Sequence, residues 1–233
     1  MKFGVVIFPG SNCDEDMIYT LESIMQQEVV RLWHKDKDLQ GADIIALPGG
    51  FTYGDYLRTG ALARFSPIME SVIRFAHTGG FVYGVCNGFQ ILCESGLLPG
   101  ALMFNIHQKF ICKNIYITAD NNDCAYTSLI DTNTPLKMPI ANGGGRYYAD
   151  KETLRKMRLN GQILFRYCDE NGKISDETNP NGSVDNIAGV CNEKKNVLGM
   201  MPHPERASDV ELGNTDGRVF FESILKSLEK VEG

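Results

Sequence analysis

The chain up to about residue 100 alternates between short apolar runs and segments whose apolar side chains recur at helical spacing. The apolar runs, which predict buried β-strands, are residues 3–8, 29–33, 43–47 and 81–85. Helical spacing begins after Asn12, with Glu15 placed as in a capping box, and recurs over residues 68–77 and 87–95. Strands and helices alternating in this order predict βαβ units and a parallel sheet.

The second half of the chain is richer in strand patterns. Residues 109–118 alternate, residues 163–167 form a short apolar run, and residues 187–191 and 197–201 flank a turn as a hairpin does. A closing amphipathic helix is predicted over 219–229. The whole chain therefore predicts one α/β domain over residues 1–233. We expect an open, mostly parallel twisted sheet with helices on both faces, and a strand-rich C-terminal half.

Composition and charge exclude several classes of protein. The 233 residues carry a formal net charge of -6 and no basic run, which argues against a nucleic-acid surface. No apolar stretch approaches the ~20 residues of a membrane-spanning helix. The seven cysteines form no CxxC pair, which favours reduced thiols over disulfides or a zinc site. These features predict a cytoplasmic protein that binds neither nucleic acid nor membrane.

The segment GVCNG around Cys86 directly follows a predicted strand and directly precedes a predicted helix. A cysteine in this position has the layout of a nucleophile elbow, a sharp turn that presents the reactive side chain. The N-terminus of a helix also favours the thiolate, because its dipole and free N–H groups stabilise negative charge. The alternative is a buried structural cysteine at a tight turn. The two flanking glycines favour the nucleophile.

A thiol nucleophile needs a base, and the chain has four histidines. Two of them stand near charged residues or glycines and are predicted to be exposed: His34 and His77. His203 lies in the segment MPHPE after the last predicted strand, where Glu205 can reach the same face of an extended chain. A carboxylate next to a histidine orients the ring and stabilises the imidazolium. Alone, this segment equally fits a rigid turn; with Cys86, it favours a Cys-His-Glu triad.

The segment LPGG that ends at Gly50 follows another predicted strand. Its glycines leave backbone N–H groups unobstructed, as an oxyanion hole requires. An ordinary turn after a strand could have the same sequence. Ligands of open parallel sheets bind at the carboxyl ends of the strands. We therefore expect one crevice to contain Gly50, Cys86 and His203.

The GVCNGFQ elbow together with the late HPE resembles the class I, triad-type glutamine amidotransferases. The resemblance covers nearly all of residues 3–226. It is strongest to the family of glutaminase subunits of phosphoribosylformylglycinamidine synthase, which act in purine biosynthesis. The most specific segments are GGFTYGDYLR, NGSVDNIAG and NVLGMMPHPER.

The resemblance implies a role for each matching residue. Cys86 would be the nucleophile, His203 the general acid and base, and Glu205 the residue that orients His203. The oxyanion hole would consist of the N–H groups of Gly50 and Asn87. The substrate-binding residues would be Gly49, Phe51, Gln90 and Asn105.

Three positions depart from the family pattern. Asn142 and Gly144 stand where the family usually has His and Glu, and Phe104 stands where a basic residue is common. No triad position is lost, so we expect glutaminase chemistry to survive. The departures concern the support of the glutamine pocket or the docking of a partner.

The resemblance also implies partners. The chain would hydrolyse glutamine and deliver ammonia to a synthetase subunit, with a small third subunit bridging the two. It has no P-loop, so ATP, Mg²⁺ and formylglycinamide ribonucleotide are expected on the synthetase, and no metal or cofactor is expected in this chain.

Three alternatives remain open. The chain could serve a different synthetase, although the GGFTYGDYLR segment argues against this. It could be a hydrolase or chaperone-like protein of flavodoxin-like architecture, against which the late HPE speaks. It could also be a scaffold subunit with a decayed site, which the intact Cys86, His203 and Glu205 argue against.

Overall fold

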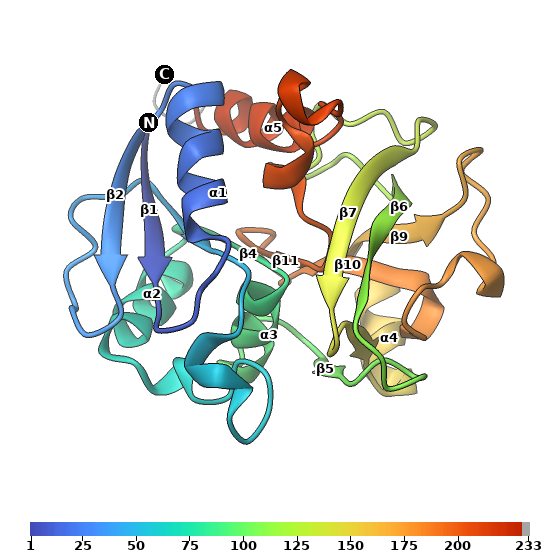
Figure 1. The fold of residues 1–233 in the computed structure, drawn as a ribbon, viewed down its shortest axis with the longest axis horizontal. Helices are drawn as coiled ribbons and strands as arrows, with labels where there is room; N and C mark the ends of the chain where they lie inside the picture. The colour runs from blue at the N-terminus through green and yellow to red at the C-terminus, as the bar shows by residue number, and fades with distance from the viewer. Residues whose placement is uncertain (230–233) are drawn as a thin grey trace.

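The computed structural model describes residues 1–229, whose centre is a nine-stranded sheet. Its strands are β1 (Lys2–Ile7), β2 (Glu28–Trp33), β3 (Ile44–Leu47), β4 (Phe81–Val85), β6 (Ile111–Ala119), β7 (Leu136–Asn142), β9 (Ile163–Cys168), β10 (Ile187–Cys191) and β11 (Val197–Met200). They are arranged in the order β2-β1-β3-β4-β11-β10-β9-β6-β7 (Figure 1). Neighbours from β2 to β11 are parallel, and neighbours from β11 to β7 are antiparallel. A separate two-stranded sheet pairs β5 (Ala101–Met103) with β8 (Arg146–Tyr148).

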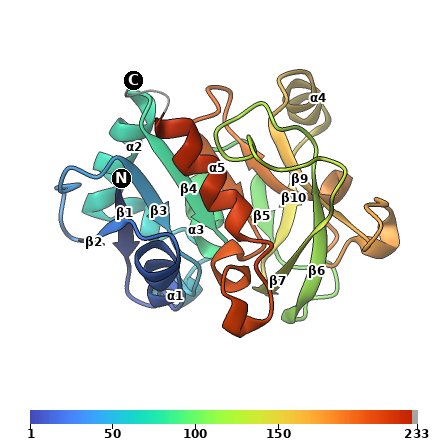
Figure 2. The same ribbon diagram turned by 90° about the horizontal axis from the view of Figure 1, so that it is seen from above.

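Helices cover both faces of the large sheet, as the sequence predicts. They are α1 (Asp14–Tyr19), α2 (Pro67–His77), α3 (Asn87–Glu94), α4 (Lys151–Leu159) and α5 (Arg218–Glu229). One hydrophobic core contains the buried side chains of α1 and α5, and a second contains those of α2, α3 and α4. Figure 1 shows the first pair above the sheet and the other three below it, and in Figure 2 α1 and α5 lie in front of the strands. The predicted α/β class is thereby confirmed.

The burial of each strand explains which elements the sequence reveals. Every residue of β3 is buried, because helices cover the parallel strands on both faces, and such strands appear as continuous apolar runs. The pattern of β7 is weaker, since buried residues alternate with exposed or half-buried ones and Pro139 interrupts it. The sequence patterns predict neither β7 nor α4. The single-domain organisation stays a prediction.

The start of α1 differs from the prediction. The predicted N-cap, Asn12, lies outside the helix, and Cys13 occupies the N-cap position without a side-chain cap hydrogen bond. The N–H groups of Asn12 and Cys13 both donate to the carbonyl of Gly49, each at 3.2 Å. A tertiary contact therefore replaces the local cap, and it ties the β1–α1 loop to the end of β3.

None of the helices within residues 1–229 has both the length and the apolar character that a bilayer-spanning segment requires.

Candidate active site

Cys86 lies at a strained turn between β4 and α3. Its backbone angles are φ 51° and ψ -105°, a conformation that side chains with a Cβ rarely adopt. Such strain persists only where the surrounding structure imposes it, and it is common at reactive positions. The predicted nucleophile elbow is therefore present at the expected residue. The side chain is buried, with 5% of its surface exposed.

The glycine after the elbow is required by close packing. A Cβ at Gly88 would lie 2.0 Å from the carbonyl oxygen of Leu47, the last residue of β3. Only glycine allows α3 to begin so close to the neighbouring strand. This contact places the start of α3, and with it Cys86, next to the segment that contains Gly49 and Gly50.

Gly88→Ala is expected to destabilise the fold, because β3 or α3 must shift to relieve the overlap. Overpacking costs about 1–3 kcal/mol, so we expect the melting temperature to fall by roughly 2–12 °C. Scanning calorimetry would measure the difference. Gly143→Ala is the matched control, since its Cβ would meet nothing nearer than 3.7 Å. Equal melting temperatures for the two variants would contradict the packing argument.

His203 and Glu205 form a buried pair directly after β11. Nδ1 of His203 lies 2.5 Å from Oε1 of Glu205, and the two side chains are 1% and 0% exposed. The backbone holds both residues in place: the His203 N–H donates to the carbonyl of Pro139 on β7, and the Thr20 hydroxyl donates to the carbonyl of Glu205. The predicted partnership is present, and both side chains are buried.

The electrostatics of the pair favour the imidazolium. Burial by itself lowers the pKa of His203, but the carboxylate of Glu205 and the thiol of Cys86 outweigh it and raise the pKa to about 10. Nε2 of His203 is buried and has no hydrogen-bond partner among the described residues. A buried polar atom without a partner is costly unless function requires it. Nε2 is thus free to exchange a proton with a substrate or with Cys86.

The structure brings Cys86 to His203. A Cβ at Gly49 would lie 2.8 Å from Cε1 of His203 and 3.3 Å from Cβ of Cys86, so both side chains border the same glycine. The Cys86 thiol is within 3.6 Å of the carbonyl of Ala141. No hydrogen bond joins this thiol to Nε2 of His203 among the described residues, and catalytic hydrogen bonds are often long in the absence of substrate.

Both predicted oxyanion donors lie near Cys86, since Asn87 follows it in the chain and Gly50 lines the same cavity. Gly50 pairs with Ser11 in an isolated antiparallel bridge, which fixes the backbone after β3. Asn87 is the first residue of α3, where N–H groups have no partner within the helix. Its side chain accepts a hydrogen bond from the Thr52 N–H at 3.1 Å and donates to Gln90 at 2.7 Å. These bonds tie the elbow to the loop that follows Gly50.

A cavity of about 220 Å³ opens at Cys86. Gln90 lies in its wall and donates a hydrogen bond to the carbonyl of Gly144 at 2.7 Å. The lining residues are Gly50, Phe51, Asp55, Thr59, Cys86, Gln90, Phe104, Phe110, Ala141, Asn142, Gly143 and Gly144. Phe51, Gln90 and all three departures from the family pattern therefore surround one space. Two larger cavities, of about 380 and 460 Å³, are lined by no cysteine or histidine among residues 1–229.

Asn105 does not line this cavity. Its side chain donates to the carbonyls of Lys109 and Asn142 and accepts from the Gly145 N–H, so all its polar atoms are engaged with backbone. Asn105 supports the loop after β7 from behind. Its predicted contact with substrate stays a prediction, as do the roles of the other predicted site residues.

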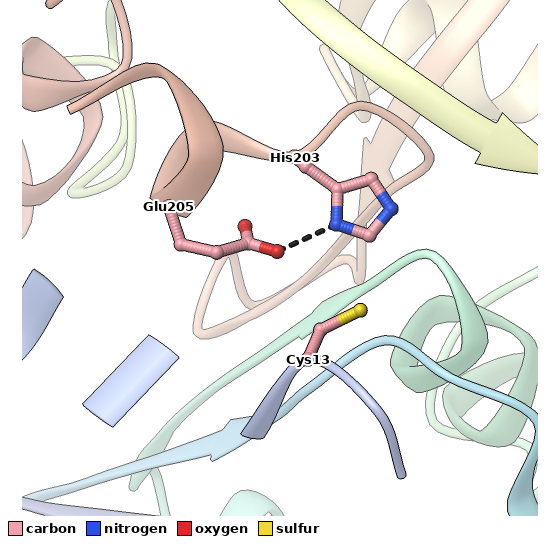
Figure 3. Close-up of side chains that lie close together, drawn as sticks. All are labelled: Cys13, His203 and Glu205. Carbon is pink, nitrogen blue, oxygen red and sulfur yellow. Dashed lines mark hydrogen bonds and ion pairs between the residues drawn. The ribbon is translucent and has the colours of Figure 1, made fainter. Parts of the chain in front are cut away.

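Sequence analysis missed Cys13, which lies next to the His203–Glu205 pair. Figure 3 shows its thiol pointing toward the imidazole from the β1–α1 loop. Burial, with help from the charge of Glu205, raises the pKa of Cys13 to about 12, so the thiol stays neutral. Nη2 of Arg206 lies 3.0 Å from its sulfur. No local motif marks Cys13, since only the fold brings it to residue 203.

Cys13, His203 and Glu205 are also the one set of potential metal ligands within residues 1–229, their donor atoms lying within 4.8 Å of one another. These groups already have partners: Glu205 bonds to His203, and the guanidinium of Arg206 contacts Cys13. A cation beside the thiol disfavours a divalent ion at this position. That this chain needs no metal stays a prediction.

His34 is buried, which corrects the prediction of an exposed side chain. Only 5% of its surface is exposed, and its Nδ1 lies 2.6 Å from the hydroxyl of Tyr53. The charged neighbours in sequence, Lys35 and Asp36, suggested a surface position. The loop carrying Tyr53 covers the end of β2 and buries the ring, and this burial lowers the pKa of His34.

Comparison with known proteins fits this geometry. Residues 1–217 match the CobB/CobQ-like glutamine amidotransferase domain. Curated phosphoribosylformylglycinamidine synthase subunits PurQ from Koribacter versatilis and Acaryochloris marina are 54% and 51% identical to this chain. The alignments cover 99% and 98% of this chain, and 100% and 97% of those proteins. The chain belongs to the PurQ family of glutamine amidotransferases.

Solved structures support the family and the fold. A chain in the structure of PurLQS from Thermotoga maritima superposes with a TM-score of 0.85 at 41% identity, covering 97% of this chain and 98% of that one. A glutamine amidotransferase from the same organism matches at a TM-score of 0.56 and 13% identity, covering 100% of this chain and 85% of its own. The second likeness concerns the fold alone. PurQ family membership confirms the resemblance found in the sequence.

Proposed function

We propose that this chain is the glutaminase subunit of a phosphoribosylformylglycinamidine synthase. It hydrolyses glutamine and delivers the ammonia to a synthetase subunit, which uses ATP to convert formylglycinamide ribonucleotide to the amidine. The observation that carries this proposal is the assembly of Cys86, His203 and Glu205 beside one cavity in a full-length member of the PurQ family.

The reaction begins with attack of the Cys86 thiolate on the side-chain carboxamide of glutamine. The negative charge on the oxygen is stabilised by the N–H groups of Gly50 and Asn87. His203 gives a proton to the leaving nitrogen, which departs as ammonia and leaves a glutamyl thioester. His203 then takes a proton from water, which attacks the thioester and releases glutamate.

Each group in this cycle acts where the structure makes it effective. Removing a single oxyanion donor typically costs about 2.7–4 kcal/mol of transition-state stabilisation. Glu205 holds His203 with Nδ1 toward the carboxylate, which leaves Nε2 for proton transfer. Released ammonia would become ammonium in neutral water and lose its nucleophilicity. The product must therefore pass directly to the synthetase, which is why the chain acts within a complex containing a small bridging subunit.

The same proposal places the chain in the cytoplasm. All seven cysteines are free, including the exposed Cys112, and several raised thiol pKa values result from burial. A reducing compartment keeps such thiols free.

Glutamate release from glutamine tests the function directly. The purified chain would be assayed alone, and then with the synthetase and bridging subunits, formylglycinamide ribonucleotide and ATP. We expect release to rise sharply in the complete mixture, because docking aligns the segment around Gly50. No release in either assay, from folded chain with a free Cys86 thiol, would instead favour the scaffold alternative.

A further inference from the structure

Asp55 has an unusual environment in the loop between β3 and α2. Its Oδ1 atom is buried and has no hydrogen-bond partner among the described residues. Its backbone φ is +53°, in the left-handed region that non-glycine residues rarely occupy. Neither feature helps the fold, so the loop holds this carboxylate in place at a cost in stability.

No cation compensates the charge of Asp55 within residues 1–229. Burial alone raises the pKa of this carboxyl to about 6, with no contribution from a charged neighbour. Arg58, three residues further on, is bound to Glu94 by two hydrogen bonds of 2.7 Å. A half-buried carboxylate left without a cation in the protein is suited to a cation from outside.

Asp55 lines the same cavity as Cys86 and is the only acidic residue that lines it among residues 1–229. An adjoining cavity, which also contains Cys86, is lined by Asn12, His203 and Arg206 but by no carboxylate. Gln90 cannot substitute for Asp55, because both ends of its amide are bonded to Asn87 and Gly144. The space next to the nucleophile therefore offers one anionic group to a ligand.

We propose that Asp55 binds the α-ammonium group of the substrate amino acid and so selects free glutamine over amides that lack this charge. This inference rests on the proposed function, because it takes glutamine as the substrate. When the carboxamide lies at Cys86, the α-amino group lies at the other end of a short carbon chain. A cavity of about 220 Å³ brings both ends of so small a ligand within reach of its walls.

Binding at Asp55 depends on pH through its own ionisation. Cys86 on the elbow lines the same cavity, and the ionisable residues near Asp55 in the chain are Tyr53, Tyr56 and Arg58, the last of which is bound to Glu94. β7 contributes only Ala141 and Asn142, which do not titrate. Above about pH 6 Asp55 is charged and binds the ammonium; below it, the carboxyl is neutral. The KM for glutamine therefore rises as the pH falls through this value.

Asp55→Asn in the assembled synthase tests the proposal. The KM for glutamine should rise about 10- to 150-fold, the range for losing a hydrogen bond to a charged group, while kcat stays within about threefold. Hydrolysis of glutaramate, which has the same carboxamide but no α-amino group, should be unchanged. Asp55→Glu should recover part of the affinity for glutamine. The exposed Asp36→Asn is the matched control and should behave as wild type.

The outcomes separate this inference from the proposed function. An equal loss toward glutamine and glutaramate would overturn the binding role and make Asp55 a structural residue of the loop. Absence of glutaminase activity in the wild-type complex would instead contradict the function itself.

Thermal melting of the isolated chain gives a second, independent measurement. The folded pKa of Asp55 is raised, so ionisation destabilises the fold as the pH rises from about 4 to 6. Asp55→Asn should therefore melt higher than wild type at pH 8 and equally at pH 4.

Discussion

Cys86→Ala is expected to abolish glutamine-dependent synthesis by the assembled synthase while leaving ammonia-dependent synthesis intact. The substitution removes the atom that forms the thioester, and loss of a nucleophile in a comparable triad lowers kcat by about 10⁶-fold. Added ammonium salt bypasses the glutaminase, since the acceptor site lies on the synthetase. Product formation with glutamine and with ammonium chloride, measured side by side, gives the two rates.

The control for this experiment is Cys112→Ala, which removes an exposed thiol on β6 and should leave both rates unchanged. Loss of both activities in a folded Cys86→Ala variant would contradict the assignment. Retention of glutamine-dependent synthesis would move the nucleophile to Cys13, the other thiol beside His203. The raised pKa of Cys13, about 12, makes that outcome unexpected, because the thiol is protonated at neutral pH.

The central elements of the site could be predicted because their signals are local. The elbow combines an apolar strand, a helix start and two glycines within a few residues, and close packing against Leu47 explains why glycine stands at residue 88. His203 and Glu205 are two residues apart, so their pairing needs no knowledge of the fold. The parallel strands appear in the sequence as apolar runs because both of their faces are covered.

Other parts of the site depend on contacts between distant segments. Cys13 reaches His203 only because the β1–α1 loop is tied to Gly49, and Arg206 completes that cluster. The wall formed by Ala141 to Gly144 lies at the end of β7 and in the turn after it, and the mixed burial of β7 and Pro139 conceal this strand in the sequence. Asp55 lies in a loop whose backbone is set by tertiary packing. A single sequence shows neither the burial of its oxygen nor the missing cation.

The antiparallel half of the sheet explains how these segments meet. β11 pairs with β4 in parallel and with β10 in antiparallel, so His203 emerges next to Cys86, while β9, β6 and β7 continue the sheet on the other side of β10. The His203 N–H then bonds to Pro139 of β7, which brings the far edge of the sheet back to the site. The strand-rich half predicted from the sequence thus supplies one wall of the cavity.

Glu205→Gln is expected to lower kcat for glutamine hydrolysis by about 10³–10⁴-fold, although the glutamine side chain has nearly the same shape as glutamate. The corresponding change in a serine protease triad costs about 10⁴-fold, because the imidazole adopts the wrong tautomer. Without the charge of residue 205, burial dominates and lowers the pKa of His203, so the imidazolium no longer forms at neutral pH. Iodoacetamide should then alkylate Cys86 more slowly at pH 7, since thiolate forms best beside a cation.

The pH dependence of stability gives an independent measure of the same pair. The folded pKa of His203 is raised to about 10, above the unfolded value of ~6.5, so its stabilising contribution is complete below pH 6.5 and lost as the pH approaches 10. The free energy of unfolding of wild type, measured with urea, should fall as the pH rises across this window. The Glu205→Gln variant should not show this fall. Glu152→Gln, which breaks an exposed ion pair with Lys156 on α4, is the control and should keep the wild-type profile. Two results together would contradict this role: a Glu205→Gln variant that keeps the wild-type pH profile of stability and whose Cys86 is alkylated as fast as in wild type. The carboxylate would then not set the charge of His203, and Glu205 would not belong to the catalytic triad.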